Sequence, residues 1–150
     1  MTPTELLYLE DFNLLETNAK ITETLRENDR DVIILDQTAF YPQGGGQPYD
    51  RGIIESPSAR FLVEEVRFAD GTVKHIGKFE RGAFKPGEMV HLSVDTERRK
   101  LNSRIHSAGH VVDMAVTALN LGWIPGKGYH FPDGPYVEYA GNISDSDREK

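Results

Sequence analysis

The sequence predicts an α+β protein in which a small β-barrel or sandwich precedes one long amphipathic helix. Short stretches rich in β-branched and aromatic residues fill the first 95 positions, with turn residues about every ten positions. This spacing is typical of small all-β domains. Between Leu101 and Leu119, apolar residues recur at steps of three and four, which is the period of a helix with one apolar face.

Each expected strand is a short run of strand-forming residues bounded by turn residues. Residues 32–35 are a continuous run of large aliphatic side chains, as in a strand that is buried on both faces. The Asp70-Gly71 step between two other runs has the signature of a tight hairpin turn. The expected strands cover residues 4–9, 20–25, 32–35, 52–54, 61–68, 73–79 and 89–94.

Capping residues set the expected limits of the helix. Asp95 or Thr96 can cap its start, because a side-chain oxygen there accepts hydrogen bonds from free amides of the first turn. Gly122 is expected to end it in a left-handed conformation. A turn over residues 123–128 and an extended aromatic stretch over 129–139 should follow.

The last residues have the form of a helix start. Ser146 and Glu149 have the spacing of a capping box, so we expect a further helix and a sequence that continues beyond Lys150. The resulting division is a β-barrel over residues 1–95 and the first part of a second, truncated domain over residues 96–150.

The composition excludes several classes of protein. The 150 residues include no cysteine, which rules out disulfides and cysteine-based metal ligands or nucleophiles. The chain has no apolar run that could span a bilayer and no secretory signal, so we expect a cytoplasmic protein without a membrane partner. The net charge of −7 argues against nucleic-acid binding by bulk electrostatics. Residues 60–104, however, hold ten basic and seven acidic residues, which gives either a local basic face or an ordinary mixed surface.

A polar line runs along the predicted helix through Asn102, His106 and His110. Two histidines four residues apart lie one above the other, so both rings can reach one metal ion or anionic group; the alternative is two surface histidines. The metallopeptidase motif needs Glu directly after the first histidine, and this chain has Ser107 at that position, which argues against metallopeptidase chemistry. Gly109 weakens the helix by roughly 1 kcal/mol relative to alanine, which makes sense if another group approaches the backbone closely.

Three consecutive glycines, Gly44, Gly45 and Gly46, precede Gln47. Glycines adopt positive φ readily and can present bare backbone amides, so the loop could hold a ribose or a phosphate. The alternative is a tight connection between two strands. The pattern is neither a P-loop nor a dinucleotide fingerprint.

Three motifs carry a resemblance to a known family. Residues 38–52 read T-x-F-Y-P-x-G-G-G-Q-P-x-D-x-G, residues 98–110 contain R-x-x-L-N followed by H-S-A-G-H, and residues 128–139 read G-Y-H-F-P-D-G-P-Y-V-E-Y. In this order they resemble the editing domain of alanyl-tRNA synthetase, and most closely the freestanding alanyl-tRNA editing proteins that share it. The resemblance covers nearly the whole chain.

The resemblance implies a translation-factor-like β-barrel that bears the glycine-rich loop, followed by the start of an α/β editing domain with the H-x-x-x-H helix. It implies a hydrolase that removes wrongly attached serine, with glycine as a second candidate, from alanine tRNA. It also implies zinc, with His106 and His110 at the positions of two ligands. The family's other ligands lie in a downstream Cys-x-x-x-His that this chain lacks, so the ligand set is incomplete; His130 or a carboxylate could substitute.

Roles for the remaining residues follow from the resemblance and from chemistry. Thr38 matches the family's discriminating threonine, and a site that hydrogen-bonds the serine hydroxyl would reject alanine. We therefore predict catalytic roles for Thr38 and Gln47. Predicted substrate-binding residues are Gly44, Gly45, Gly46, Asn102 and Arg104. The alternatives are a catalytically incomplete tRNA-binding or interaction module, and a metal-dependent hydrolase of small esters or amides. The sequence leaves open the oligomeric state and whether the parent is freestanding or fused to a synthetase.

Overall fold

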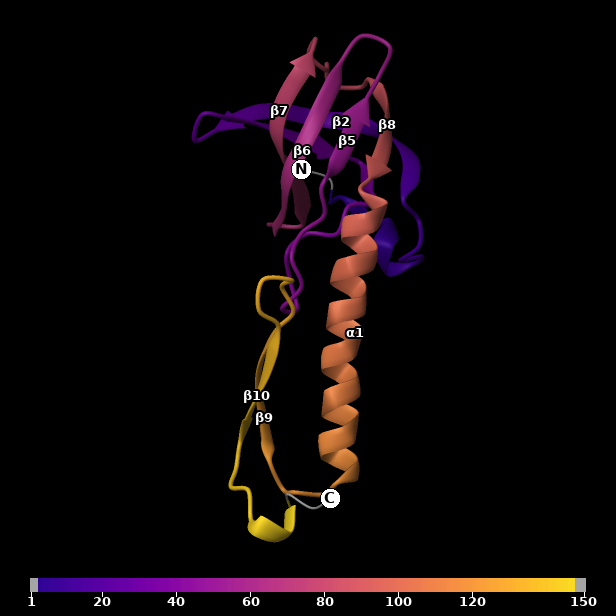
Figure 1. Ribbon diagram of the computed structural model, residues 1–150. Coiled ribbons are helices and arrows are strands. Elements are labelled where there is room, and N and C mark those ends of the chain that lie inside the picture. The colour runs from indigo at the N-terminus through magenta and orange to yellow at the C-terminus, as the bar shows by residue number, and fades with distance from the viewer. Residues whose placement is uncertain (1–2, 148–150) are drawn as a thin grey trace. The chain divides into compact units, whose positions relative to one another are not determined.

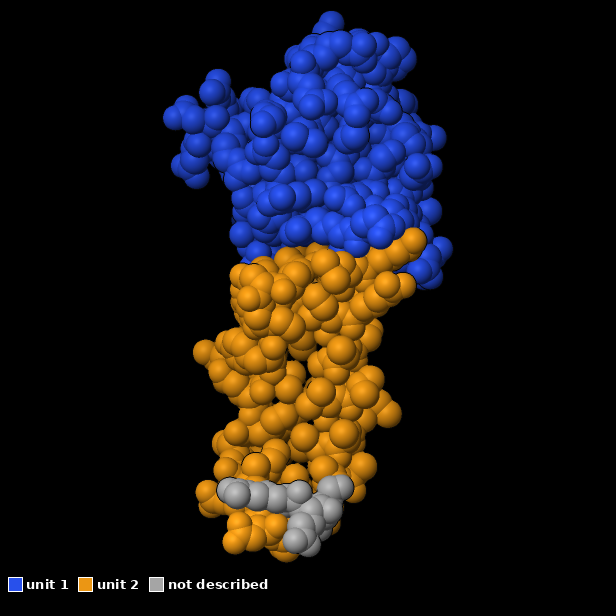
Figure 2. Space-filling view, viewed as in Figure 1, with its two compact units in different colours: residues 1–43, 49–99 blue, residues 44–48, 100–150 orange. Residues whose placement is uncertain are grey.

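The structure, a computed structural model, describes residues 3–147 and is mostly β with one long helix (Figure 1). It divides into two compact units, which Figure 2 shows in different colours. Unit 1 comprises residues 1–43 and 49–99, and unit 2 comprises residues 44–48 and 100–150. The division falls inside the helix, after Arg99. The predicted domain boundary at residues 95 and 96 stays a prediction.

Unit 1 is a closed antiparallel barrel with the strand order β2-β3-β7-β6-β5-β8. The barrel strands are β2 (Glu16–Glu27), β3 (Arg30–Leu35), β5 (Gly52–Glu55), β6 (Arg60–Ala69), β7 (Thr72–Arg81) and β8 (Met89–Val94). The predicted fold class, a β-barrel followed by a long helix in an α+β protein, is confirmed. Alternating side chains fill the barrel interior, because successive residues of a strand point to opposite faces. The largest fully buried apolar side chains are Phe40, Phe61, Ile21, Ile33, Leu35, Ile54 and Leu92.

Local turn chemistry explains the edges of the barrel strands. Asp70 and Gly71 have φ angles of 51° and 79°, as a type I′ hairpin turn requires, so the predicted hairpin is confirmed. The strand expected over residues 4–9 is wrong beyond Leu6. Strand β1 (Glu5–Leu6) pairs in parallel with β4 (Gln37–Thr38), and a 3-10 helix follows at Leu7–Leu9.

Helix α1 (Thr96–Ala118) begins where the sequence predicts and ends earlier than expected. The Oδ1 atom of Asp95 accepts a hydrogen bond from the backbone N–H of Arg98 at 3.0 Å, which identifies Asp95 as the N-cap. The predicted end at Gly122 is wrong. Asn120, with φ of 51°, already takes the left-handed conformation, which asparagine tolerates better than most residues.

An antiparallel hairpin of β9 (Ile124–Tyr129) and β10 (Tyr136–Ala140) completes unit 2 (Figure 1). The turn expected over residues 123–128 is therefore wrong, since most of that stretch is strand β9. Its glycines serve packing instead of a turn: a Cβ on Gly126 would lie 3.1 Å from the Cβ of Glu138. The chain reverses after β9, where the N–H of Gly134 donates to the carbonyl of Phe131 at 3.3 Å.

The apolar stripe of α1 is only partly covered. Ile105, Ala108 and Val112 line a pocket of about 280 Å³ with the hairpin residues Tyr136 and Val137. The ends of the stripe are exposed, with Leu101 at 49% and Leu119 at 38%. No helix in the described range 3–147 is long and apolar enough to cross a membrane.

The predicted C-terminal helix start is only partly inside the structure. A short 3-10 helix covers Asp145–Asp147. Residues 148–149, the second half of the capping box, lie outside the described residues.

Candidate active site

The glycine-rich loop closes as a tight turn at Gly45 and Gly46. The N–H of Gly44 donates to the carbonyl of Gln47 at 3.2 Å, and the N–H of Gln47 donates back at 2.9 Å. The φ angles of Gly45 and Gly46 are 56° and 76°, the positive pair of a type I′ turn, which favours glycine. Within residues 3–147, the amides of Gly45 and Gly46 donate to no acceptor. The loop is thus a tight connection that also presents two free donors.

Gln47 joins this turn to the histidine helix. Its side chain is 3% exposed, and its Oε1 atom lies 2.9 Å from Nδ1 of His106. Because a carbonyl oxygen only accepts, Nδ1 of His106 carries the proton and Nε2 keeps its lone pair. The hydrogen bond thereby fixes the tautomer of His106 and leaves Nε2 to bind a metal or a substrate group.

His110 lies one turn further along α1, as its spacing predicts. The rings of His106 and His110 stack with their centroids 4.9 Å apart. The side chain of His110 is 65% exposed, and its Nδ1 is 3.5 Å from Oδ2 of Asp113. The two histidines thus share a face of the helix, one partly buried and one open to solvent.

His130 is a third member of this cluster, and from the sequence it is expected only as a possible substitute for a missing zinc ligand. It is 6% exposed, stacks on His106 with centroids 4.6 Å apart, and donates its backbone N–H to the carbonyl of Gly46 at 2.9 Å. Three glycines make room for its ring. An added Cβ would lie 2.3 Å from Cε1 at Gly109, 2.7 Å from Nε2 at Gly128 and 3.0 Å from Cδ2 at Gly46. The glycine inside the helix therefore has its explanation in the ring of His130.

The electrostatics of the cluster favour the neutral form of His106. Burial lowers the pKa of His106, and the neighbouring His130 and His110 lower it further. A neutral ring with a free Nε2 can accept a proton or bind a metal, whereas a protonated ring can do neither.

Unpaired amide groups lie buried in the same unit. Within the described residues, Nε2 of Gln47 and both side-chain polar atoms of Asn102 are buried without a hydrogen-bond partner. Such groups are rare in folded proteins and often mark a place for water, an ion or a ligand. Asn102 precedes His106 by one helical turn, and its predicted substrate-binding role stays a prediction. Arg104 is exposed, and no contact assigns it a role.

Thr38 belongs to unit 1, where its fully buried hydroxyl is part of a hydrogen-bond chain. Nδ1 of His75 lies 3.0 Å from the carbonyl of Ile33, to which it must donate. Nε2 of His75 consequently accepts from the Thr38 hydroxyl, at 2.8 Å. The N–H of Phe40 donates to Oγ1 of Thr38 at 3.0 Å, which leaves the hydroxyl one free lone pair. Burial lowers the pKa of His75 to about 4, so this ring is neutral at pH 7.

A buried ion pair in unit 1 joins Asp50, which lies two residues before β5, to Arg99 in the first turn of α1. Asp50 accepts from the Nε atom of Arg99 at 2.9 Å and from the N–H of Tyr41 at 2.7 Å. Arg99 also donates to the carbonyls of Phe12 and Ala39, both at 2.6 Å. Burial raises the pKa of the Asp50 carboxyl, and the hydrogen bonds and charge of Arg99 counteract that rise. The guanidinium of Arg99 thus holds the backbone around Asp50 and Ala39 against the first turn of α1.

Comparison with known proteins identifies the family. The family model for tRNA synthetases class II (A) matches residues 5–98. The alanyl-tRNA editing protein AlaX-M of Pyrococcus horikoshii is 36% identical over 146 residues, which are 94% of this chain and 63% of that protein. The chain belongs to the family of alanyl-tRNA synthetase editing domains and alanyl-tRNA editing proteins.

Two further relatives are similar to this chain over a smaller part of their own length. AlaX-L of Pyrococcus horikoshii is 39% identical over 115 residues, which are 77% of this chain and 28% of that protein. The alanine–tRNA ligase of Pyrococcus furiosus is 41% identical over 110 residues, which are 73% of this chain and 11% of the ligase. The chain thus spans less than two thirds of the length of each relative.

The resemblance to the alanyl-tRNA editing family implies a zinc site, and the described residues provide two candidate ligands for it. His106 and His110 lie one turn apart, and His106 has a free Nε2 held in place by Gln47. Zinc sites in proteins use three or four side-chain ligands. Within residues 3–147, no group of three or more His, Cys, Asp or Glu side chains is arranged to hold a metal ion.

Proposed function

We propose that this chain acts in editing of alanine tRNA, by hydrolysing the ester that links a wrong amino acid to the tRNA. The observation that supports this most directly is the hydrogen bond between Gln47 and His106. It joins the glycine-rich turn to the histidine helix, next to buried amides that lack partners. Relatives that match most of the chain bear the name alanyl-tRNA editing protein.

The side chains of unit 2 suit the needs of ester hydrolysis. Hydrolysis of an ester builds negative charge on the carbonyl oxygen, which preorganised N–H donors stabilise. Nε2 of Gln47 and the amides of Gly45 and Gly46 are donors without partners among the described residues. We assign them to the ester carbonyl or the terminal ribose, and we assign Asn102 to substrate binding.

We further propose that His106 and His110 are two ligands of a zinc ion. Bound zinc would polarise the ester carbonyl or lower the pKa of a bound water. The role of Gln47 in this proposal is to hold His106 by its Nδ1–H, since the outer-shell partner of a metal-binding histidine sets its orientation.

Zinc binding by the untagged protein at pH 7.5 tests the ligand assignment without any activity assay. We expect His106→Ala and His110→Ala each to lower zinc affinity at least about tenfold, and Gln47→Leu to lower it about 10- to 100-fold through its effect on His106. Elemental analysis and titration with zinc measure both content and affinity. The control is His91→Ala, which removes a barrel histidine bonded to Asn18. Equal zinc binding in the three site variants and the control would contradict the assignment.

The finer proposal is that the substrate carries serine, with glycine as a second candidate, and that Thr38 recognises the serine hydroxyl. One lone pair of the Thr38 hydroxyl remains free, so it can accept from serine but not from alanine. The hydroxyl is fully buried, so a substrate reaches it only if the residues that cover it move. We propose the cytoplasm as the location of this activity.

Thr38→Val should lower the selectivity for Ser-tRNA over Ala-tRNA about tenfold, the value of roughly one hydrogen bond. It should also lower the free energy of unfolding by about 1–3 kcal/mol, since Nε2 of His75 and the N–H of Phe40 lose their buried partner. The measurement is the rate of deacylation of Ser-tRNA and of Ala-tRNA, corrected for the folded fraction.

Thr38→Ser is the matched control, because it keeps the hydroxyl and removes one methyl group. It should retain both hydrogen bonds and the selectivity. If valine and serine variants show the same selectivity, Thr38 has only a structural role. If the wild-type chain binds tRNA but deacylates none of these substrates, the alternative of a catalytically incomplete tRNA-binding module takes the place of the editing proposal.

A further inference from the structure

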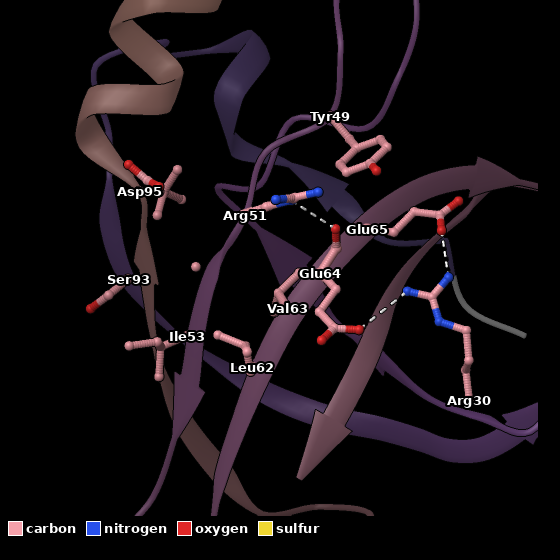
Figure 3. Close-up of a pocket in the computed structure, with 12 residues that line it drawn as sticks. Arg30, Tyr49, Arg51, Ile53, Leu62, Val63, Glu64, Glu65, Ser93 and Asp95 are labelled. Carbon is pink, nitrogen blue, oxygen red and sulfur yellow. Dashed lines mark hydrogen bonds and ion pairs between the residues drawn. The ribbon is translucent and has the colours of Figure 1, made fainter. Parts of the chain in front are cut away.

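An open pocket of about 790 Å³ lies on the barrel, in unit 1, and none of the residues to which the editing chemistry has been assigned line it. Strands β5, β6 and β8 supply most of its lining, with Ile53 and Leu62 among the apolar residues (Figure 3). Tyr49 and Arg51, which lie just before β5, contribute an aromatic ring and a guanidinium. The pocket therefore combines an apolar part with cationic and aromatic groups.

The Tyr49 ring is surrounded by arginines. The guanidinium carbons of Arg98, Arg67 and Arg51 lie 5.4, 5.5 and 6.0 Å from its centroid. Figure 3 shows the Arg51 side chain beside this ring. Each distance is within the range of a cation–π contact. Three cations around one tyrosine create a concentrated positive charge on a barrel whose chain is acidic as a whole.

Two of these arginines lack an acidic partner. Arg67 pairs with Glu65 at 2.6 Å. In contrast, the Nε atoms of Arg51 and Arg98 donate to the backbone carbonyls of Glu64 and Tyr49, at 3.2 and 2.9 Å. Neither guanidinium forms an ion pair with a carboxylate of the described residues.

The environment of Arg98 shows the cost of this arrangement. Burial lowers its pKa, and the charge of Arg51 lowers it further. Like charges held together in this way are destabilising unless an anion lies with them. Tyr49, Asp50 and Asp95 act in the opposite direction and raise the pKa of Arg98. An anion bound between Arg51 and Arg98 would relieve their remaining repulsion.

The carboxylates that line the pocket form their ion pairs and hydrogen bonds with groups other than the guanidinium groups of Arg51 and Arg98. Glu65 already pairs with Arg30, and Glu64 with Lys78, at 2.6 and 3.1 Å (Figure 3 shows the first pair). Asp95 uses its Oδ1 atom to cap α1. Among the described residues, the remaining N–H groups of Arg51 and Arg98 therefore have no carboxylate bound to them and can donate to a ligand.

We propose that Tyr49, Arg51 and Arg98 bind one nucleotide of the tRNA substrate, with its phosphate held by the two guanidinium groups and its base against the tyrosine ring. The inference rests on the proposed tRNA substrate and adds a binding site on the barrel to it. Guanidinium groups donate paired N–H bonds to phosphate oxygens, and aromatic rings stack on the bases of single-stranded RNA without sequence preference. The occupant is an unpaired nucleotide of the RNA chain.

Binding of uncharged alanine tRNA, followed by fluorescence anisotropy over a range of salt concentrations, tests this site without requiring catalysis. We expect Arg51→Gln and Arg98→Gln each to weaken binding about three- to tenfold and to lower the slope of log affinity against log salt by about 1. Tyr49→Leu should weaken binding with little change of the salt slope, and Tyr49→Phe should restore it. Arg26→Gln is the matched control, since it removes one positive charge from a barrel side chain that is 68% exposed and lies outside the pocket.

Competition distinguishes an RNA site from a general anion site. A single-stranded RNA tetranucleotide should displace labelled tRNA from the wild type, and inorganic phosphate at the same phosphate concentration should not. Equal competition by phosphate, or unchanged affinity and salt slope in Arg51→Gln, would overturn the inference while leaving the editing proposal intact if Ser-tRNA is still deacylated. A wild-type chain that binds no tRNA would overturn both.

Discussion

Replacement of Arg99 by methionine is expected to lower the free energy of unfolding by about 3–5 kcal/mol, the usual effect of breaking a buried ion pair from one side. Arg99 is 2% exposed and Asp50 is fully buried. Without the guanidinium, the carboxylate keeps the N–H of Tyr41 as a donor but loses its charged partner, and two backbone carbonyls lose the donors that Arg99 supplies. Urea denaturation at pH 7, with both midpoint and slope recorded, measures the loss.

Two further variants test whether the buried charge is the cause. The double variant Asp50→Asn with Arg99→Met should recover part of the loss, because no charge is then left unpaired. Arg99→Lys should still be clearly destabilised, since an ammonium cannot reproduce the fork of donors that reaches Asp50 and both carbonyls. If Arg99→Met unfolds at the same urea concentration as wild type, the ion pair between Asp50 and Arg99 does not stabilise the folded protein.

The sequence predicted the barrel well, because strand formation there depends on local pattern. Two local patterns indicate β6 and β7: the alternation of apolar residues within each strand and the Asp70-Gly71 turn between them. Each pattern lies within about ten consecutive positions. The errors lie at element ends and in unit 2. Residues 123–128 were expected to be a turn, since proline and glycine usually mark turns, but the glycines there are needed for close packing beside Glu138 and His130.

The candidate site was predicted only in part, because local sequence patterns indicate contacts within one element and not contacts between distant residues. The helical period of four places His106 beside His110, and this pair could be read from the sequence. The contact between Gln47 and His106 joins residues 59 positions apart. A periodic pattern within one helix or strand cannot predict a contact at that separation. The partners His75 and Arg99 were missed for the same reason, and His130 was named only as a possible substitute ligand without a predicted contact. Gly109 was the one local signal of His130, because a helix retains a glycine where another group approaches.

Acidification is expected to destabilise the barrel strongly between about pH 6.5 and pH 4, through His75. Burial lowers the pKa of this ring from 6.5 to about 4 in the folded protein. In this pH range the unfolded chain binds the proton and the folded chain does not, so falling pH favours unfolding. The contribution of His75 is fully present above about pH 6.5 and is lost as the pH falls to about 4. The difference corresponds to roughly 3 kcal/mol.

The hydrogen bonds of His75 explain why the folded ring resists the proton. Its Nδ1 already donates to the carbonyl of Ile33, and Nε2 accepts from Thr38, so protonation of Nε2 would place two donors against each other unless the Thr38 hydroxyl turned away. Urea denaturation from pH 8 to pH 4 measures the dependence. His75→Gln should flatten the curve, because the amide does not titrate, whereas His91→Gln should leave most of it in place. His106 contributes in the same direction, since its pKa is also lowered, so the difference between wild type and His75→Gln isolates the barrel histidine. A curve of unchanged steepness in His75→Gln would show that the acid sensitivity arises elsewhere.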